Sequence, residues 1–324
     1  MNIAIVVFSL VFLITLHELG HFLLAKKFDV KVHEFGIGFP PRAFAKKIGE
    51  TLYSINILPL GGFVRMMGED EKVEDERSFS EKPIWQRAII LIAGVSTSWI
   101  LAMLVFAIVA SGWGVMRFEF GEDRFNQAFL AGRLTEEDNI VNQMILENDF
   151  KFEGEEVDAD KLKSLALRDQ ELVFERDEER IVIESIDGFN LRSIGFGITH
   201  PLRVTALQAT GLRIALEGFV TGEGLPEDME FGGPVMIGDM ATEALDRGVG
   251  DYLMFVGMIA TILAFMNILP IPALDGGRLM FLGIEKVKGE PIPVRVERAV
   301  NTVFFLLIVI LMIVVTVRDI YNIF

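Results

Sequence analysis

Four long apolar stretches dominate the chain, at about residues 3–25, 88–113, 252–269 and 299–317. Each is close to the roughly 20 residues with which an α-helix crosses about 30 Å of hydrocarbon. The last stretch contains no charged side chain, which favours a membrane span over the alternative of a buried helix in a large soluble protein. We therefore expect four transmembrane helices, the third of which ends at Pro270 and Pro272.

A segment with the alternation of a β-strand lies between the first two stretches, at residues 53–57. Gly61 and Gly62 then indicate a turn before residues 63–67. The pattern predicts an apolar, membrane-associated β-hairpin that includes Asn56. Two interpretations stay open: a small structural sheet, or an edge that hydrogen-bonds an extended peptide.

The region between the second and third stretches has the pattern of an α+β domain. Residues 144–157 predict strand–turn–strand, residues 158–167 a short helix, and residues 170–186 a hairpin that turns at 177–179. Apolar positions at helical spacing in residues 201–222 predict an amphipathic helix. The expected organisation is a membrane part at 1–112, an outer domain at 113–200, an amphipathic helix and linker at 201–250, and a second membrane part at 251–324.

Charge is unevenly distributed along the chain and indicates its orientation in a membrane. Residues 113–250 hold 29 acidic and 13 basic side chains, whereas the rest of the chain holds 17 of each, which argues against a nucleic-acid partner. Basic residues follow the first span at positions 26, 27 and 31, precede the second at 82 and 87, and precede the fourth at 295 and 298. The positive-inside rule then predicts that loops 26–87 and 276–298 are cytoplasmic and that region 113–250 and both termini are extracytoplasmic. No basic residue precedes the first span, so we expect it to be retained rather than cleaved as a signal peptide.

The first apolar stretch contains the candidate chemistry, in the pentapeptide HELGH. The chain has no cysteine and four histidines, so a thiolate metal site is excluded and an imidazole site must draw on these four. His17 and His21 are four residues apart and share one face of a helix, with Glu18 beside them. This pattern is typical of two zinc ligands and a general base. Ionisable groups within a span are costly and usually functional, although a non-catalytic polar pair in a helix bundle is the alternative.

A catalytic zinc site needs a third protein ligand. The third histidine of common soluble zinc proteases is absent, because position 27 is Lys27. Asp275 follows the proline-broken end of the third span and precedes two glycines. It can be an ordinary helix cap, but broken helices at membrane depth often line polar cavities, and beside an incomplete two-histidine site the ligand interpretation is favoured.

The chain resembles the site-2 protease family of intramembrane zinc metalloproteases, most closely the bacterial branch that includes the regulator of sigma-E protease. The resemblance rests on six motifs in the family's order: HELGH at 17–21, FGIGFPPR at 35–42, YSINILPLGGFVRM at 53–66, KPIWQRAIILIAG at 82–94, GGPVMI at 232–237 and NILPIPALDGGRL at 267–279. It implies that zinc is bound by His17, His21 and Asp275 and that Glu18 activates water. It also implies that Asn267 and the hairpin, with Asn56, Gly61 and Gly62, hold the substrate.

The same resemblance implies the cellular context. The substrate would be a single-span membrane protein, such as an anti-sigma factor or a signal-peptide remnant, cleaved in the lipid bilayer. The protein would be a multi-pass protein of a bacterial inner membrane, and its outer domain would be a degenerate PDZ-like domain.

One departure from the family concerns the second span. The family usually has Ala-Gly-Pro-x-x-Asn where this chain has residues 93–98, with Val95 and Ser98 in place of the proline and asparagine. This departure leaves open a zinc-binding but catalytically inactive membrane scaffold. A transporter is a further alternative, but four spans without repeated halves disfavour it.

Overall fold

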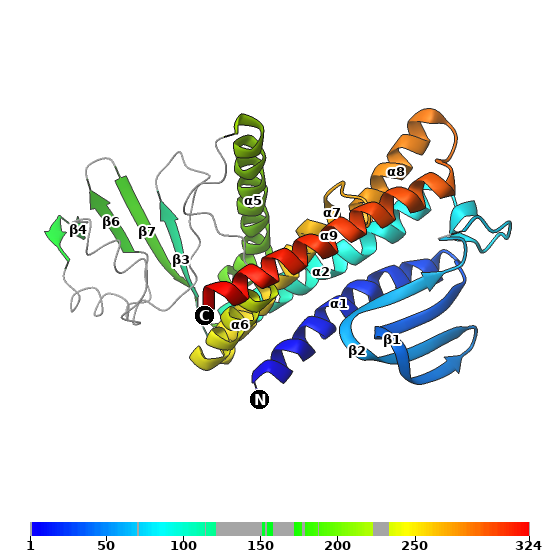
Figure 1. Ribbon diagram of the computed structural model, residues 1–324. Helices are drawn as coiled ribbons and strands as arrows, with labels where there is room; N and C mark the ends of the chain where they lie inside the picture. Colours follow the sequence, from blue (N-terminus) through cyan, green and yellow to red (C-terminus); the bar gives the residue numbers. More distant parts are fainter. Residues whose placement is uncertain are drawn as a thin grey trace. The chain divides into compact units, whose positions relative to one another are not determined.

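The computed structural model describes residues 2–69, 71–113, 115–120, 151–152, 154–157, 172–176, 179–186, 188–222 and 233–323. The chain divides into two compact units. The first comprises Met1–Leu101, Glu227–Asp246 and Ile259–Phe324, and the second comprises Ala102–Pro226 and Arg247–Met258. The candidate site belongs to the first unit. Figure 1 shows the elements, coloured along the chain.

Within the described part of the chain, four helices are long and apolar enough to cross a membrane, as predicted: α1 (Asn2–Lys27), α2 (Ile84–Gly112), α7 (Val249–Ile268) and α9 (Val294–Ile323). In α9, 0% of the most apolar 18-residue window is buried within the protein. A soluble protein could not leave so continuous an apolar surface in water, so the alternative of four buried helices fails.

The first sheet consists of two long strands, β1 (Val32–Ile48) and β2 (Thr51–Met66), which pair antiparallel. The expected turn at Gly61 and Gly62 is wrong, because both glycines lie within β2. Segments 53–57 and 63–66 do not pair with each other. Each pairs with β1, so that Phe35 lies opposite both Val64 and Tyr53. The sequence did not predict β1, the strand that pairs with both segments. Its second half is exposed and lacks the alternating burial that a strand pattern would reveal.

A buried carboxylate is accommodated inside this sheet. Glu34 is 2% exposed, and its oxygens accept hydrogen bonds from Arg42 Nε at 3.0 Å and Ser54 Oγ at 2.8 Å. Burial opposes ionisation of Glu34, but the hydrogen bonds from Arg42 and Ser54 outweigh it and lower the pKa of this carboxyl group. These bonds join the two halves of β1 to each other and the first half to β2.

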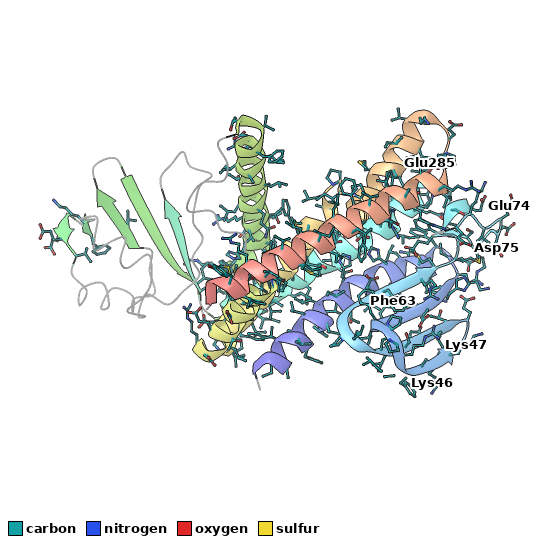
Figure 2. All side chains as sticks on the ribbon, viewed as in Figure 1. Lys46, Lys47, Phe63, Glu74, Asp75 and Glu285 are labelled. Atoms are coloured by element: carbon teal, nitrogen blue, oxygen red, sulfur yellow. The ribbon has the colours of Figure 1, made fainter. Side chains whose placement is uncertain are left out.

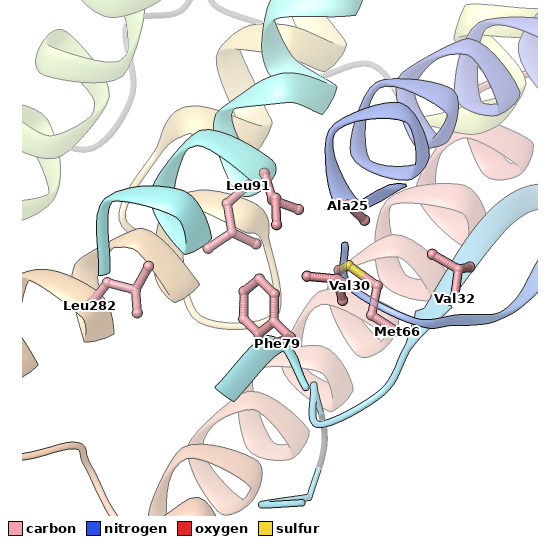
Figure 3. Packing of buried hydrophobic residues seen from close by; sticks show 8 residues of the cluster. Ala25, Val30, Val32, Met66, Phe79, Leu91 and Leu282 are labelled. Atoms are coloured by element: carbon pink, nitrogen blue, oxygen red, sulfur yellow. The ribbon is translucent and has the colours of Figure 1, made fainter. Parts of the chain in front are cut away.

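A hydrophobic cluster fastens the sheet to the helices that carry the site (Figure 3). It joins the end of α1, both strands, the short 3₁₀-helix η1 (Phe79–Glu81), α2, and α8 (Asp275–Lys288). Its buried members are Ala25, Val30, Val32, Met66, Phe79, Ile90, Leu91 and Leu282. Because close-packed side chains resist displacement, this cluster holds α1, α2 and α8 in register with one another.

Two helices were not expected from the sequence, α8 and α6 (Pro234–Arg247). The third span does end before the two prolines, at Ile268. Residues 269–274 then form a short connection, and the chain starts α8 at Asp275. Asp275 is therefore in the first turn of a helix, where a carboxylate is electrostatically favoured.

The second unit contains an antiparallel sheet and a long helix. The sheet has the order β3 (Val115–Phe120), β7 (Glu179–Ile186), β6 (Leu172–Arg176), β4 (Lys151–Phe152) and β5 (Glu155–Glu156). The hairpin predicted in 170–186 is confirmed by the pairing of β6 with β7. Of the strand–turn–strand predicted in 144–157, β4 pairs with β5, and residues 144–150 lie outside the described residues. The helix predicted at 158–167 lies outside the described residues. The amphipathic helix is α5 (Leu191–Thr221), which begins ten residues earlier than expected.

Candidate metal centre

Three side chains from distant parts of the sequence meet in the first unit. Nε2 of His17 lies 3.0 Å from Oδ2 of Asp275, and Nε2 of His21 lies 3.2 Å from the same oxygen. The two Nε2 atoms are 3.3 Å apart. Both imidazoles are buried in α1, and Asp275 projects from the start of α8. Among the residues that the structure describes, this is the group of three that could hold a metal ion.

The dimensions of this triangle fit zinc. In a tetrahedral zinc site with bonds of about 2.0–2.1 Å, neighbouring ligand atoms lie roughly 3.3 Å apart. Two imidazole nitrogens and one carboxylate oxygen are a donor set that zinc prefers, and three protein ligands leave the fourth position free for chemistry.

Gly94 of α2 lies next to the triangle and leaves the space there free of side-chain atoms. A Cβ at this position would lie 2.2 Å from Nε2 of His21 and 2.7 Å from Nε2 of His17. Any side chain would therefore overlap the ligand atoms. The glycine is required here for close approach of the backbone to the two imidazoles.

The outer nitrogen of each imidazole meets an oxygen of α2. Nδ1 of His21 donates to the carbonyl of Ile90 over 2.8 Å, and Nδ1 of His17 lies 3.0 Å from the hydroxyl of Ser98. Both rings consequently turn their Nε2 atoms toward Asp275. Such partners orient metal-binding histidines and select their tautomer.

Glu18 lies on α1 beside this triangle, half-buried and among charged neighbours. The ionisable side chains around it include His21, Asp275, Glu69 and Arg278. Strand β2 passes directly beside it, because a Cβ on Gly62 would lie 3.4 Å from Cγ of Glu18. The carboxylate thus stands between the candidate ligands and the sheet.

The connection that delivers Asp275 is held in an unusual conformation. Ala273 has φ +76°, a region that alanine rarely adopts and that costs about 1 kcal/mol or more. Its amide donates to Oδ1 of Asn301, in α9, over 3.0 Å. The fourth span therefore contributes to the site through one polar side chain that fixes the backbone two residues before Asp275.

A cavity of about 720 Å³ opens beside α8 and the start of α9. Its wall includes the ion pairs Arg278–Glu69 and Arg87–Glu285, which tie two successive parts of α8 to the segment after β2 and to α2. Figure 2 marks Glu285 on α8.

The remaining predicted site residues have partners within the fold. Nδ2 of Asn267 donates to the carbonyl of Leu263 over 2.9 Å, in the last turns of α7. Asn56 is buried, and its Nδ2 donates to the carbonyl of Gly38 over 3.0 Å. Gly61 has φ +142°, and a Cβ there would lie 3.0 Å from the ring of Phe39. Of the residues expected to hold substrate, Gly62 lies beside Glu18. The side-chain amides of Asn56 and Asn267 donate hydrogen bonds to backbone carbonyls of the protein itself.

Sequence reasoning did not single out Gly94, Ile90, Asn301 or Arg278. The available signal for Gly94 was its place in the Ala93-Gly94 pair within an otherwise apolar span. Ser98 lies one helical turn further along α2 and was noted only as a departure from the family pattern. The contact of Asn301 with Ala273 joins residues that no sequence spacing relates.

Comparison with known proteins is consistent with this geometry. The model of peptidase family M50 matches residues 5–311. A Clostridium perfringens protein named as a zinc metalloprotease is 33% identical over 323 residues, which cover 95% of each chain. The regulator of sigma-W protease RasP of Bacillus subtilis is 28% identical over 427 aligned positions, which cover 99% of each chain. A third similar protein, named as a zinc metalloprotease of Fusobacterium nucleatum, is 30% identical over the full length of both chains. The family model covers the part of the chain that contains the motifs and the three candidate ligands. The chain therefore belongs to peptidase family M50, the site-2 protease family.

Proposed function

We propose that this protein is an intramembrane zinc metalloprotease that hydrolyses peptide bonds in or near the transmembrane segments of membrane proteins. The observation that carries the proposal is the convergence of His17, His21 and Asp275 within 3.0–3.3 Å of one another at the end of a proline-broken span. Those three residues would hold the zinc ion. When bound, zinc supplies a Lewis acid that lowers the pKa of water toward neutrality and polarises a carbonyl group.

Glu18 acts as the general base in this proposal. It removes a proton from the attacking water as the new C–O bond forms. It then delivers that proton to the nitrogen of the leaving amine as the peptide C–N bond breaks. Its place on α1 beside His17 and against Gly62 supports this role. The half-buried position limits its contact with bulk water.

The sheet is the proposed substrate platform. A helical transmembrane segment shields its carbonyls by hydrogen bonding, so it must be extended before attack. Gly61 and Gly62 carry no side chains of their own, and Gly62 lies close to Glu18, which suits an added strand along this segment of β2. Asn56, which shapes the sheet at Gly38, and Asn267, in the last turns of α7, complete the proposed substrate site.

The proposed setting is a bacterial inner membrane, with loops 26–87 and 276–298 in the cytoplasm and both termini outside. The sheet of the second unit, together with the helix predicted at 158–167, would form a degenerate PDZ-like outer domain that selects an already trimmed single-span protein. RasP is named for the regulation of sigma-W. An anti-sigma factor is accordingly one substrate of the proposed class, and a signal-peptide remnant is another.

The variant Glu18→Gln tests the proposal. Purified protein in lipid would be given a single-span reporter whose transmembrane segment contains helix-breaking residues. We expect Glu18→Gln to bind zinc like the wild type and to lose cleavage by about 10²-fold or more, because the general base is gone. Glu74→Gln, the same change on an exposed side chain, serves as the control. Undiminished cleavage by Glu18→Gln would refute the role of this residue.

The same assay separates the protease from an inactive scaffold. That alternative rested on the altered residues 95–98, yet Ser98 contacts His17 and Val95 lies within the continuous helix α2. Wild-type protein that binds zinc but never cleaves the reporter would favour the scaffold.

A further inference from the structure

Helix α2 presents one oxygen to each of the two imidazoles, and the two oxygens differ in chemistry. The carbonyl of Ile90 can only accept a hydrogen bond, so the 2.8 Å contact fixes the proton of His21 on Nδ1. The hydroxyl of Ser98, 3.0 Å from Nδ1 of His17, can accept or donate. Ser98 is 1% exposed, so bulk water does not compete for this contact.

A histidine that offers Nε2 to a metal ion must carry its proton on Nδ1. With the hydroxyl of Ser98 as acceptor, His17 has this tautomer, and its ring plane is fixed toward Asp275. Without the hydroxyl, Nδ1–H would be buried and unpaired, and the opposite tautomer, with its proton on Nε2 facing the carboxylate, would gain population.

We propose that Ser98 is a positioning residue that holds His17 in the tautomer and orientation needed for metal binding. The inference rests on the proposed function, since it concerns the same metal centre. The inference gives a role in the metal centre to Ser98, which replaces the asparagine of the usual family motif. The partner of its hydroxyl is Nδ1 of His17. Ser98 touches neither the substrate nor the reacting atoms.

Zinc affinity of Ser98→Ala, measured by competition with a chelator, is the first test. Loss of a partner to a metal-binding histidine typically costs about 10–100-fold in metal affinity, and we expect a loss in this range. Ser96→Ala is the matched control, because Ser96 lies two residues away on the exposed face of the same helix. We expect Ser96→Ala to keep the wild-type affinity.

A second readout detects the tautomer itself. The chain has four histidines, so ¹⁵N-histidine labelling yields few imidazole signals. In the zinc-loaded wild type we expect protected Nδ1–H signals for both His17 and His21. In Ser98→Ala only the His17 signal should lose its protection, and the intact His21 signal reports that the helices remain packed.

The outcomes separate this inference from the proposed function. Wild-type protein that binds no zinc would overturn both. Zinc-binding wild type with an unchanged affinity and an unchanged His17 signal in Ser98→Ala would overturn the role of Ser98 alone. If Ser98→Ala does not fold, Ser98→Thr decides. It keeps the hydroxyl and should stay within about threefold of wild-type affinity, and a loss of tenfold or more with an intact His21 signal would contradict the inference.

Discussion

At the scale of single residues, the centre depends on positions that contribute no ligand atom. Ile90 and Ser98 orient the two imidazoles, and Gly94 leaves room between them. The pattern HELGH identifies His17, Glu18 and His21 because helical spacing alone brings the two histidines together. Asp275 could be proposed from its chemistry and its place after a broken span. The supporting residues could not be proposed, because their roles follow from which face of α2 packs on α1.

Gly94→Ala provides a residue-scale prediction. The added methyl group would overlap Nε2 of His21, so either the imidazole or α2 must move. We expect a loss of zinc affinity at least as large as the ~10–100-fold seen when a histidine loses its orienting partner. Chelator competition measures it. Gly112→Ala in the same helix is the control, since a Cβ there meets no atom within 4 Å. Equal zinc affinity of Gly94→Ala and Gly112→Ala would contradict the geometry described.

At the scale of elements, apolar periodicity predicted the spans well and the sheet poorly. The bounds of the four spans were expected within six residues, because the thickness of the hydrocarbon sets the length of a helix. The pairing of β1 with both halves of β2 was missed, because strand register depends on contacts distant in sequence. Helix α8 was concealed by Gly276 and Gly277, which ordinarily favour a loop.

The turn between β1 and β2 is anchored by Glu50, and this anchor depends on pH. Its oxygens accept hydrogen bonds from Arg77 at 2.7 Å and from Lys26 at 2.6 Å. The hydrogen bonds from Arg77, followed by that from Lys26, lower the pKa of Glu50 from 4.5 to about 2. A carboxyl group with a lowered folded-state pKa stabilises the fold fully above its unfolded pKa, and this stability is lost as the pH falls from about 4.5 toward 2.

We therefore expect the thermal midpoint of wild-type protein to exceed that of Glu50→Gln at pH 7, and the difference to shrink as pH falls below about 4.5. Thermal unfolding in detergent at several pH values measures this. Glu74→Gln is the control for removal of an exposed carboxylate. A difference between wild type and Glu50→Gln that stays constant from pH 7 to pH 3 would show that the contacts of Glu50 do not stabilise the turn.

At the scale of the whole molecule, the distribution of charge assigns a side of the membrane to each loop. Lys46 and Lys47 lie at the outer edge of the β1–β2 sheet (Figure 2), in the loop proposed to be cytoplasmic. Leu191 begins α5 and is 87% exposed, in the region proposed to be outside. The natural chain has no cysteine, so single cysteines can report each side without background.

Lys46→Cys and Leu191→Cys test this orientation in spheroplasts of a bacterial host. A membrane-impermeant maleimide should label Leu191→Cys in intact spheroplasts and Lys46→Cys only after the membrane is permeabilised. The basic loops should remain inside, as the positive-inside rule requires. The reverse pattern of labelling would invert the proposed topology.

The most direct test of the central claim is the zinc content of the wild type and of Asp275→Asn, measured beside cleavage of the same reporter. The account predicts one zinc ion per wild-type chain, a large loss of zinc and of cleavage in Asp275→Asn, and no change in Asp239→Asn, which alters an exposed carboxylate of α6. An Asp275→Asn protein that retains both its zinc and its activity would contradict the account, because a different group would then complete the site.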